Sequence, residues 1–144
     1  MIHLGELDAD GLLGRRPSAA VRTLLDDVVA APLLLWATPI FRATYSGLLK
    51  VVFDQLPSDA LAGSVSILAA TAGGPTHYLS LDTGLRSLVA SLAGWSTPSV
   101  VYSASSDFTN GEPNDAVREQ MATAFAEAAT ISGTRQTSPA ENQP

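Results

Sequence analysis

Two short stretches of the chain carry residue types that suit the binding of a flat ring with polar edges. They follow the apolar runs 33–37 and 65–70, and consist of Thr38, Pro39, Ile40, Phe41, Thr71, Gly73 and Gly74. The two glycines let a ring or a phosphate come close to their backbone N–H groups. The threonine hydroxyls can donate and accept hydrogen bonds, and Phe41 adds aromatic surface. No cluster of His and carboxylate residues accompanies these residues, so the pattern does not favour a metal site.

Ordinary turn chemistry is an alternative explanation for both stretches. A Gly-Gly pair after a strand is often only a tight strand-to-helix turn, and Thr-Pro is common at turns. His3 and His77 have no Ser, Cys or Asp partner in a recognisable catalytic order, so we expect structural or capping roles for them.

The strands and helices that alternate along the chain must position these residues. Short apolar runs predict strands at 2–4, 33–37, 65–70 and 100–102, and apolar residues at helical spacing predict helices at 17–30, 43–56, 81–92 and 117–128. Such β-α alternation predicts an α/β fold of three layers, with a parallel sheet between helices. The carboxyl ends of parallel strands share one sheet edge, so both stretches are expected to line one crevice.

Composition fixes the broad class. The chain has 144 residues, of which 46% are hydrophobic and 15% charged, with a net charge of −6 and no cysteine. This predicts one globular domain at 1–131, followed by a disordered polar tail at 132–144. The sequence has no basic patch of the kind that binds nucleic acid, and its longest apolar run is too short to span a membrane. The lack of cysteine suits a cytoplasmic location.

One long segment resembles a known family. Residues 37–50 read ATPIFRATYSGLLK and resemble the ATPVY-x-A-x-YSGLLK signature of NAD(P)H-dependent FMN reductases, which are flavodoxin-like proteins. The motifs Asp54–Pro57, Ala60–Gly63, Ala70–Gly74, His77 and Leu81–Arg86 follow in the family's order. The match covers about Asp26 to Ser103. Ala72 and Thr83 depart from the family pattern, and Tyr102–Phe108 resembles the branch that partners luciferase-like monooxygenases.

The resemblance implies an oxidoreductase that uses FMN with NAD(P)H as co-substrate. Thr38, Pro39, Ile40 and Phe41 would contact the ribityl chain and one side of the isoalloxazine, and Thr71, Gly73 and Gly74 would contact its pyrimidine edge. Hydride passes directly from nicotinamide to flavin, so no catalytic side chain is expected. The resemblance also implies a homo-oligomer, with the apolar face of helix 43–56 as a candidate surface, and a flavin-dependent monooxygenase as a possible partner.

The family's first strand, phosphate-binding loop and first helix have no counterpart in the sequence. Residues 1–7 resemble the second strand instead, so we expect a flavodoxin-like sheet without its first strand and helix. The chain could start at an internal methionine of a longer reading frame, be a decayed paralogue, or have the place filled by another chain. A second hypothesis is therefore a non-catalytic paralogue or fragment that acts as an oligomerisation or regulatory partner. A one-electron carrier ranks third, because the negative charge is modest and scattered.

Overall fold

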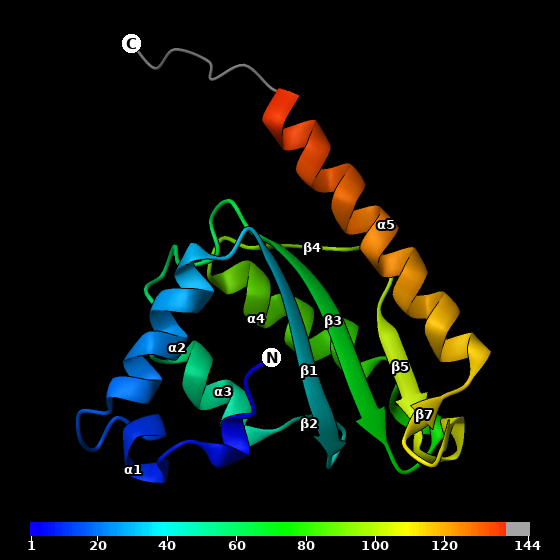
Figure 1. The fold of residues 1–144 in the computed structure, drawn as a ribbon, viewed down its shortest axis with the longest axis horizontal. Coiled ribbons are helices and arrows are strands. Elements are labelled where there is room, and N and C mark those ends of the chain that lie inside the picture. Colours follow the sequence, from blue (N-terminus) through cyan, green and yellow to red (C-terminus); the bar gives the residue numbers. More distant parts are fainter. Residues whose placement is uncertain (138–144) are drawn as a thin grey trace.

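Parallel strands form the centre of the molecule (Figure 1). The structure is a computed structural model, and it describes residues 1–137. The parallel strands are β1 (Leu33–Phe41), β3 (Val65–Ala72), β4 (Trp95–Ser96) and β5 (Val101–Ala104). Strand β3 pairs with β1 along one side and with β4 and then β5 along the other. Antiparallel pairs are added by β2 (Thr44–Tyr45) on β1, and by the hairpin of β6 (Phe108–Thr109) and β7 (Glu112–Pro113).

Helices connect the strands. The α-helices are α1 (Ala9–Leu12), α2 (Ala19–Ala30), α3 (Gly47–Phe53), α4 (Arg86–Ser91) and α5 (Asp115–Thr137). Short 3-10 helices are η1 (Leu4–Glu6), η2 (Pro75–His77) and η4 (Ser105–Asp107), and the π-helix η3 (Leu81–Leu85) leads into α4. Among the described residues, no helix is long and apolar enough to cross a membrane.

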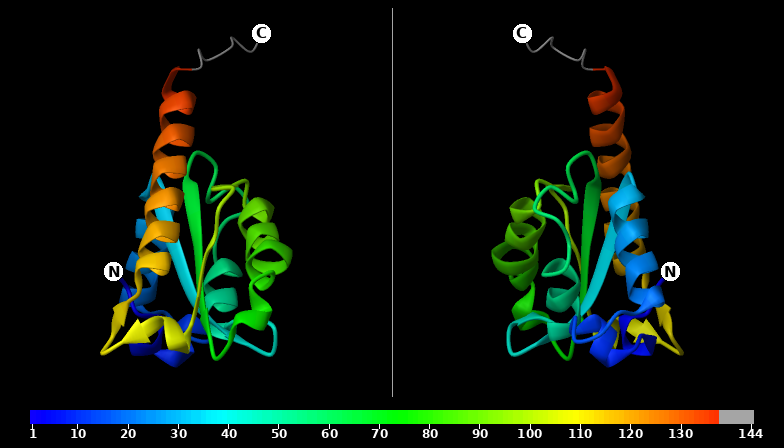
Figure 2. Two further views of the ribbon diagram at one scale, coloured as in Figure 1. Left: turned by 90° about the vertical axis from the view of Figure 1, so that its right-hand side faces the viewer. Right: turned by 90° about the vertical axis from the view of Figure 1, so that its left-hand side faces the viewer.

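Each face of the sheet packs in its own hydrophobic cluster. Val65, Ile67 and Ala69 of β3 pack on one side with residues of α5, such as Ala124. Leu68 lies in the other cluster, which includes buried residues of α2, α3 and α4. Figure 2 shows the sheet between α5 and α4. The predicted three-layer α/β architecture is confirmed, with strands 33–37, 65–70 and 100–102 inside or overlapping β1, β3 and β5.

The predictions for two elements in the N-terminal half of the chain were wrong. Residues 2–4 form no strand, and η1 begins at Leu4. The predicted helix 43–56 is shorter, because Thr44 and Tyr45 pair with β1 and only then does α3 begin. Ser46 caps α3, its hydroxyl accepting a hydrogen bond from the Leu49 amide at 3.3 Å.

Helix α5 extends further than the sequence predicts. The disordered tail was expected from residue 132, but α5 continues to Thr137. The rest of that predicted tail, 138–144, lies outside the described residues.

At the end of α4, the residue in the left-handed conformation is an alanine and not the glycine that follows it. Ala93 has the positive φ, at 60°, and the Gly94 amide donates to the Val89 carbonyl at 3.1 Å. Gly94 is needed for another reason. A Cβ there would lie 2.8 Å from side-chain atoms of Leu61 and Val89.

These two residues give a paired prediction for stability. Ala93→Gly relieves the left-handed strain but adds chain entropy to the unfolded state, so we expect a gain of about 0.5 kcal/mol in the free energy of unfolding. Gly94→Ala forces a methyl group into packed atoms, and we expect a loss of about 2 kcal/mol. Urea denaturation of both variants tests this, and equal effects of the two would contradict it.

Candidate functional site

The carboxyl ends of β1 and β3 bring the two predicted stretches together. Pro39 of β1 is the register partner of Thr71 of β3, and Thr38 is the partner of Ala70. In Figure 1 the β1–β2 turn and the segment after β3 lie at the same end of the sheet. The expectation that both stretches share one sheet edge is confirmed, whereas the crevice that they were expected to line stays a prediction. We call this region, from Thr38 to Phe41 and from Thr71 to Gly74, the carboxyl edge.

Strand β1 is longer than predicted. Residues 38–41 were expected in a loop, but they continue the strand to Phe41. Thr38 and Ile40 are buried, whereas Pro39 and Phe41 are exposed on the other face, with Phe41 at 64%. The register places the backbone N–H positions of odd-numbered β1 residues away from β3, so Pro39 removes no ladder hydrogen bond.

A strained turn closes the β1–β2 hairpin. Phe41 pairs with Thr44, so Arg42 and Ala43 form a two-residue turn with φ of 53° and 64°. Such turns usually contain Asn or Gly, because both residues need positive φ. Residues other than glycine in this conformation store strain, and such strain clusters at binding sites.

Thr38 anchors this hairpin from inside the protein. Its side chain is 4% exposed, and its hydroxyl accepts a hydrogen bond from the Ser46 amide at 3.0 Å and donates to the Pro39 carbonyl at 3.1 Å. The hydroxyl is therefore already used within the protein. Thr38 acts on the carboxyl edge by fixing the course of the chain from Pro39 to Ser46.

Removal of this hydroxyl gives a second prediction. Thr38→Val keeps the shape of the side chain but leaves the Ser46 amide without its acceptor, so we expect the free energy of unfolding to fall by about 1–3 kcal/mol. Thr23→Val in α2 is the matched control, because the Thr23 hydroxyl is exposed and bonds only a helix carbonyl. Thermal or urea unfolding of both variants measures this. A loss no greater than the control's would show that Thr38 is no anchor.

Gly73 and Gly74 present open backbone. Neither has a positive φ, and a Cβ built on either would meet nothing within 4 Å. Their amides donate to no group in the part of the chain that the structure describes. Neither backbone strain nor crowding in the protein itself calls for glycine here, so both positions leave space and donors for a ligand.

Three hydroxyl groups in and just after β5 donate hydrogen bonds to backbone carbonyls of residues 70–74. Ser103 donates to Ala70 at 3.4 Å, and Ser105 donates to Ala72 at 3.3 Å. The Tyr102 hydroxyl donates to the Gly74 carbonyl at 2.5 Å. These tethers were not predicted from the sequence, in which the available signal was a run of hydroxyl residues in and after the predicted strand 100–102.

Several residues of the family-like motifs have structural partners instead. Lys50 pairs with Asp54 one turn along, and this carboxylate raises the pKa of the Lys50 amine. Arg86 binds Asp82 and the chain before β5. His77 is exposed in η2.

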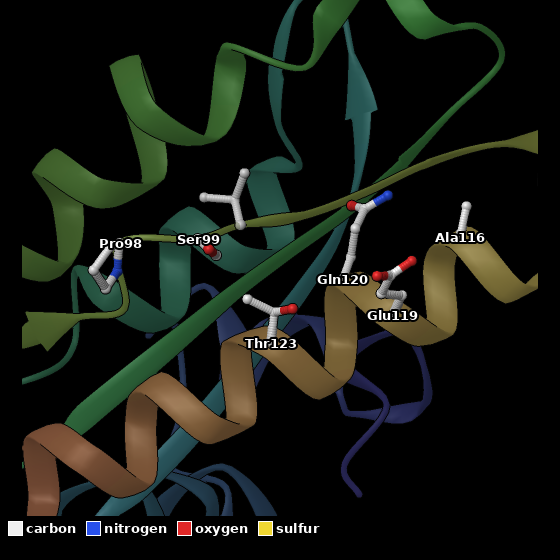
Figure 3. A pocket seen from close by; sticks show the side chains of 7 residues that line it. Pro98, Ser99, Ala116, Glu119, Gln120 and Thr123 are labelled. Atoms are coloured by element: carbon white, nitrogen blue, oxygen red, sulfur yellow. The ribbon is translucent and has the colours of Figure 1, made fainter.

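A separate hollow of about 620 Å³ lies away from the carboxyl edge, between α5 and the start of β5 at the side of the sheet (Figure 3). There the Ser99 amide donates to Glu127 at 2.8 Å and the Tyr102 amide donates to Gln120 at 2.9 Å. These side chains satisfy backbone donors of β5 and of the segment just before it, and covering an edge strand in this way blocks pairing with other chains. We therefore interpret this hollow as part of edge protection.

Comparison with known proteins identifies the family. Residues 1–109 match the model of the family described as NADPH-dependent FMN reductase. The chain belongs to this family. Its fold is flavodoxin-like, as the resemblance implied.

Relatives in the FMN reductase family support this assignment. An "FMN reductase (NADPH)" of Pseudomonas aeruginosa is 40% identical over 92 residues, which cover 64% of this chain and 50% of that protein. The "NADH-dependent FMN reductase SfnF" of Pseudomonas fluorescens is 33% identical, covering 81% of this chain and 63% of its own length. The apo structure of the NADH:FMN oxidoreductase EMOB superposes with a TM-score of 0.82 at 35% identity, covering 90% of this chain and 70% of that one. The chain thus spans half to under two thirds of these curated relatives.

Proposed function

We propose that this protein binds FMN at the carboxyl edge and supports its reduction by NAD(P)H. The observation that carries the proposal is the pair of open glycine amides at Gly73 and Gly74, at the same end of the sheet as the exposed residues Pro39 and Phe41. The named activities of the FMN reductase relatives are consistent with it. When bound, FMN supplies the hydride acceptor and the nicotinamide supplies the hydride.

The residues at the carboxyl edge fit a flavin ring. Gly73 and Gly74 offer backbone donors to the polar pyrimidine edge, and the exposed Thr71 adds a hydroxyl. Exposed Pro39 and Phe41 offer apolar surface to one side of the ring, next to the ribityl chain. Thr38 and Ile40 face the core, so their part in this proposal is to hold the strand in place. These assignments need no side chain that transfers a proton.

Further parts of the proposal concern partners and location. A flavin-dependent monooxygenase that receives reduced FMN, a homo-oligomeric state and a cytoplasmic location stay predictions. For self-association, the apolar face of α3 is already used, since Leu49, Val52 and Phe53 are buried. The exposed side chains Leu33 and Leu35 of β1, 40% and 43% exposed, are the better candidate surface.

Steady-state kinetics test the proposed activity. NADH and NADPH oxidation are measured with added FMN, for the 144-residue chain and for a product that includes any in-frame codons upstream of Met1. FMN-dependent oxidation by either form supports the proposal. No FMN-dependent oxidation by either form would refute the enzymatic function.

A second candidate function is a non-catalytic partner of a full-length reductase. Over residues 33–37, β1 has no strand partner on its outer side among the described residues, and its Leu33 and Leu35 side chains are exposed. Such an edge can pair with a strand of another chain. Co-purification with a full-length relative and no flavin absorbance would support this function, whereas a yellow purified chain would count against it.

A further inference from the structure

We infer that Tyr102 is a positioning residue that sets the Gly73–Gly74 segment for its ligand, an inference that rests on the proposed function. Tyr102 lies on β5, and its register partner on β3 is Ala70. Its hydroxyl reaches along the sheet to the Gly74 carbonyl at 2.5 Å. Of the three hydroxyl groups that bind carbonyls of residues 70–74, that of Tyr102 holds the carbonyl furthest along the chain, that of Gly74. The amide of Gly74 is also one of the two open amides.

The geometry explains why this bond matters more than an ordinary loop contact. Gly73 and Gly74 lack side chains, so no packing of their own restricts the orientation of the peptide groups. Tyr102 is half-buried against the core and is held at its own backbone, because its amide donates to Gln120. A fixed phenol thus holds a carbonyl in a segment that would otherwise be free to rotate.

The consequence is preorganisation. With the Gly74 carbonyl engaged by the phenol, the neighbouring amides remain available to the acceptor atoms of a heterocycle in one arrangement. Binding to a segment that is already ordered costs less conformational entropy than binding that must first order the segment. Tyr102 itself makes no contact with the ring in this account.

Tyr102→Phe tests the inference, because it removes only the hydroxyl. Tyr78→Phe is the matched control, since Tyr78 is 56% exposed and lies just after η2, the short helix that follows the same segment. Two measurements are made on the full chain: backbone order parameters of the Gly73 and Gly74 amides by NMR, and the Kd for FMN by fluorescence titration. We expect Tyr102→Phe to lower both order parameters and to raise the Kd about five-fold, and Tyr78→Phe to change neither.

The two readouts separate this inference from the proposed function. If Tyr102→Phe leaves the order parameters unchanged, or loosens the segment without changing the Kd for FMN, the positioning role is refuted. If the unmodified chain binds no FMN, the proposed function fails at this site, and the order parameters alone decide the inference. Loosening in Tyr102→Phe then supports the restraint, and no loosening overturns it.

Discussion

Gly73→Val is expected to raise the Kd for FMN about 100-fold while leaving the fold intact. The protein has room for this side chain, because a Cβ at Gly73 meets nothing within 4 Å and the backbone φ is not positive. The branched side chain would occupy the space through which a ring approaches the amide. A 100-fold change corresponds to about 2.8 kcal/mol of binding free energy.

Gly133→Val is the matched control for this variant. Gly133 lies in α5, and a Cβ there also meets nothing within 4 Å. We expect both variants to melt near the temperature of the unmodified protein, and only Gly73→Val to lose FMN binding. A Kd for Gly73→Val within about three-fold of the unmodified chain's would show that no ligand approaches this amide.

Arg86→Ala is expected to lower the free energy of unfolding by about 3 kcal/mol. The Arg86 guanidinium joins the start of α4 to the chain that enters β5. It donates to the Asp82 carboxylate at 2.9 Å, to the Ser96 hydroxyl at 2.8 Å, and to the carbonyls of Thr97 at 2.7 Å and Pro98 at 3.1 Å. Hydrogen bonds to charged groups are worth more than neutral ones, and truncation leaves several acceptors without a donor.

Two further variants define this effect. Arg86→Lys keeps the charge but cannot reproduce the planar fork, so we expect it to recover less than half of the loss. Arg118→Ala is the control: its side chain is 55% exposed, against 28% for Arg86, and such exposed ion pairs contribute about 0.5 kcal/mol. Urea denaturation compares all three. Equal losses for Arg86→Ala and Arg118→Ala would contradict the proposed anchoring role.

The sequence was sufficient for the central architecture because its strands carry unambiguous patterns. The run from Val65 to Ala70 is apolar except for Ser66, as expected for a strand covered on both faces, and β3 is buried along nearly its whole length. The adjacency of Pro39 and Thr71 followed from parallel pairing alone. That part of the candidate site could be predicted without coordinates.

Other features depend on tertiary contacts that leave no local signal. Thr38-Pro39 resembles a turn, but the missing N–H of Pro39 points away from β3, so the strand continues. The true turn, Arg42-Ala43, contains none of the residues that usually mark positive φ. The π-helix η3 was not predicted either: its Gly84 lies against the ring of Tyr45, where a Cβ would be 3.2 Å from a ring carbon.

The hydroxyl tethers also escaped sequence reasoning. Tyr102 and Gly74 are 28 residues apart, and only the pairing of β5 with β3 brings them together. Serine and tyrosine after a strand have many uses, so their presence alone predicts none of these bonds.

An NMR titration of the isotopically labelled chain with FMN tests the central claim most directly. The account predicts that the largest amide shift changes fall on Gly73, Gly74 and Phe41, at the ends of β3 and β1. It predicts much smaller changes around Ser99 and Gln120, beside the hollow at the outer edge of β5. Saturable shifts confined to that hollow, or no shifts at all up to millimolar FMN, would contradict the assignment of the flavin site to the carboxyl edge.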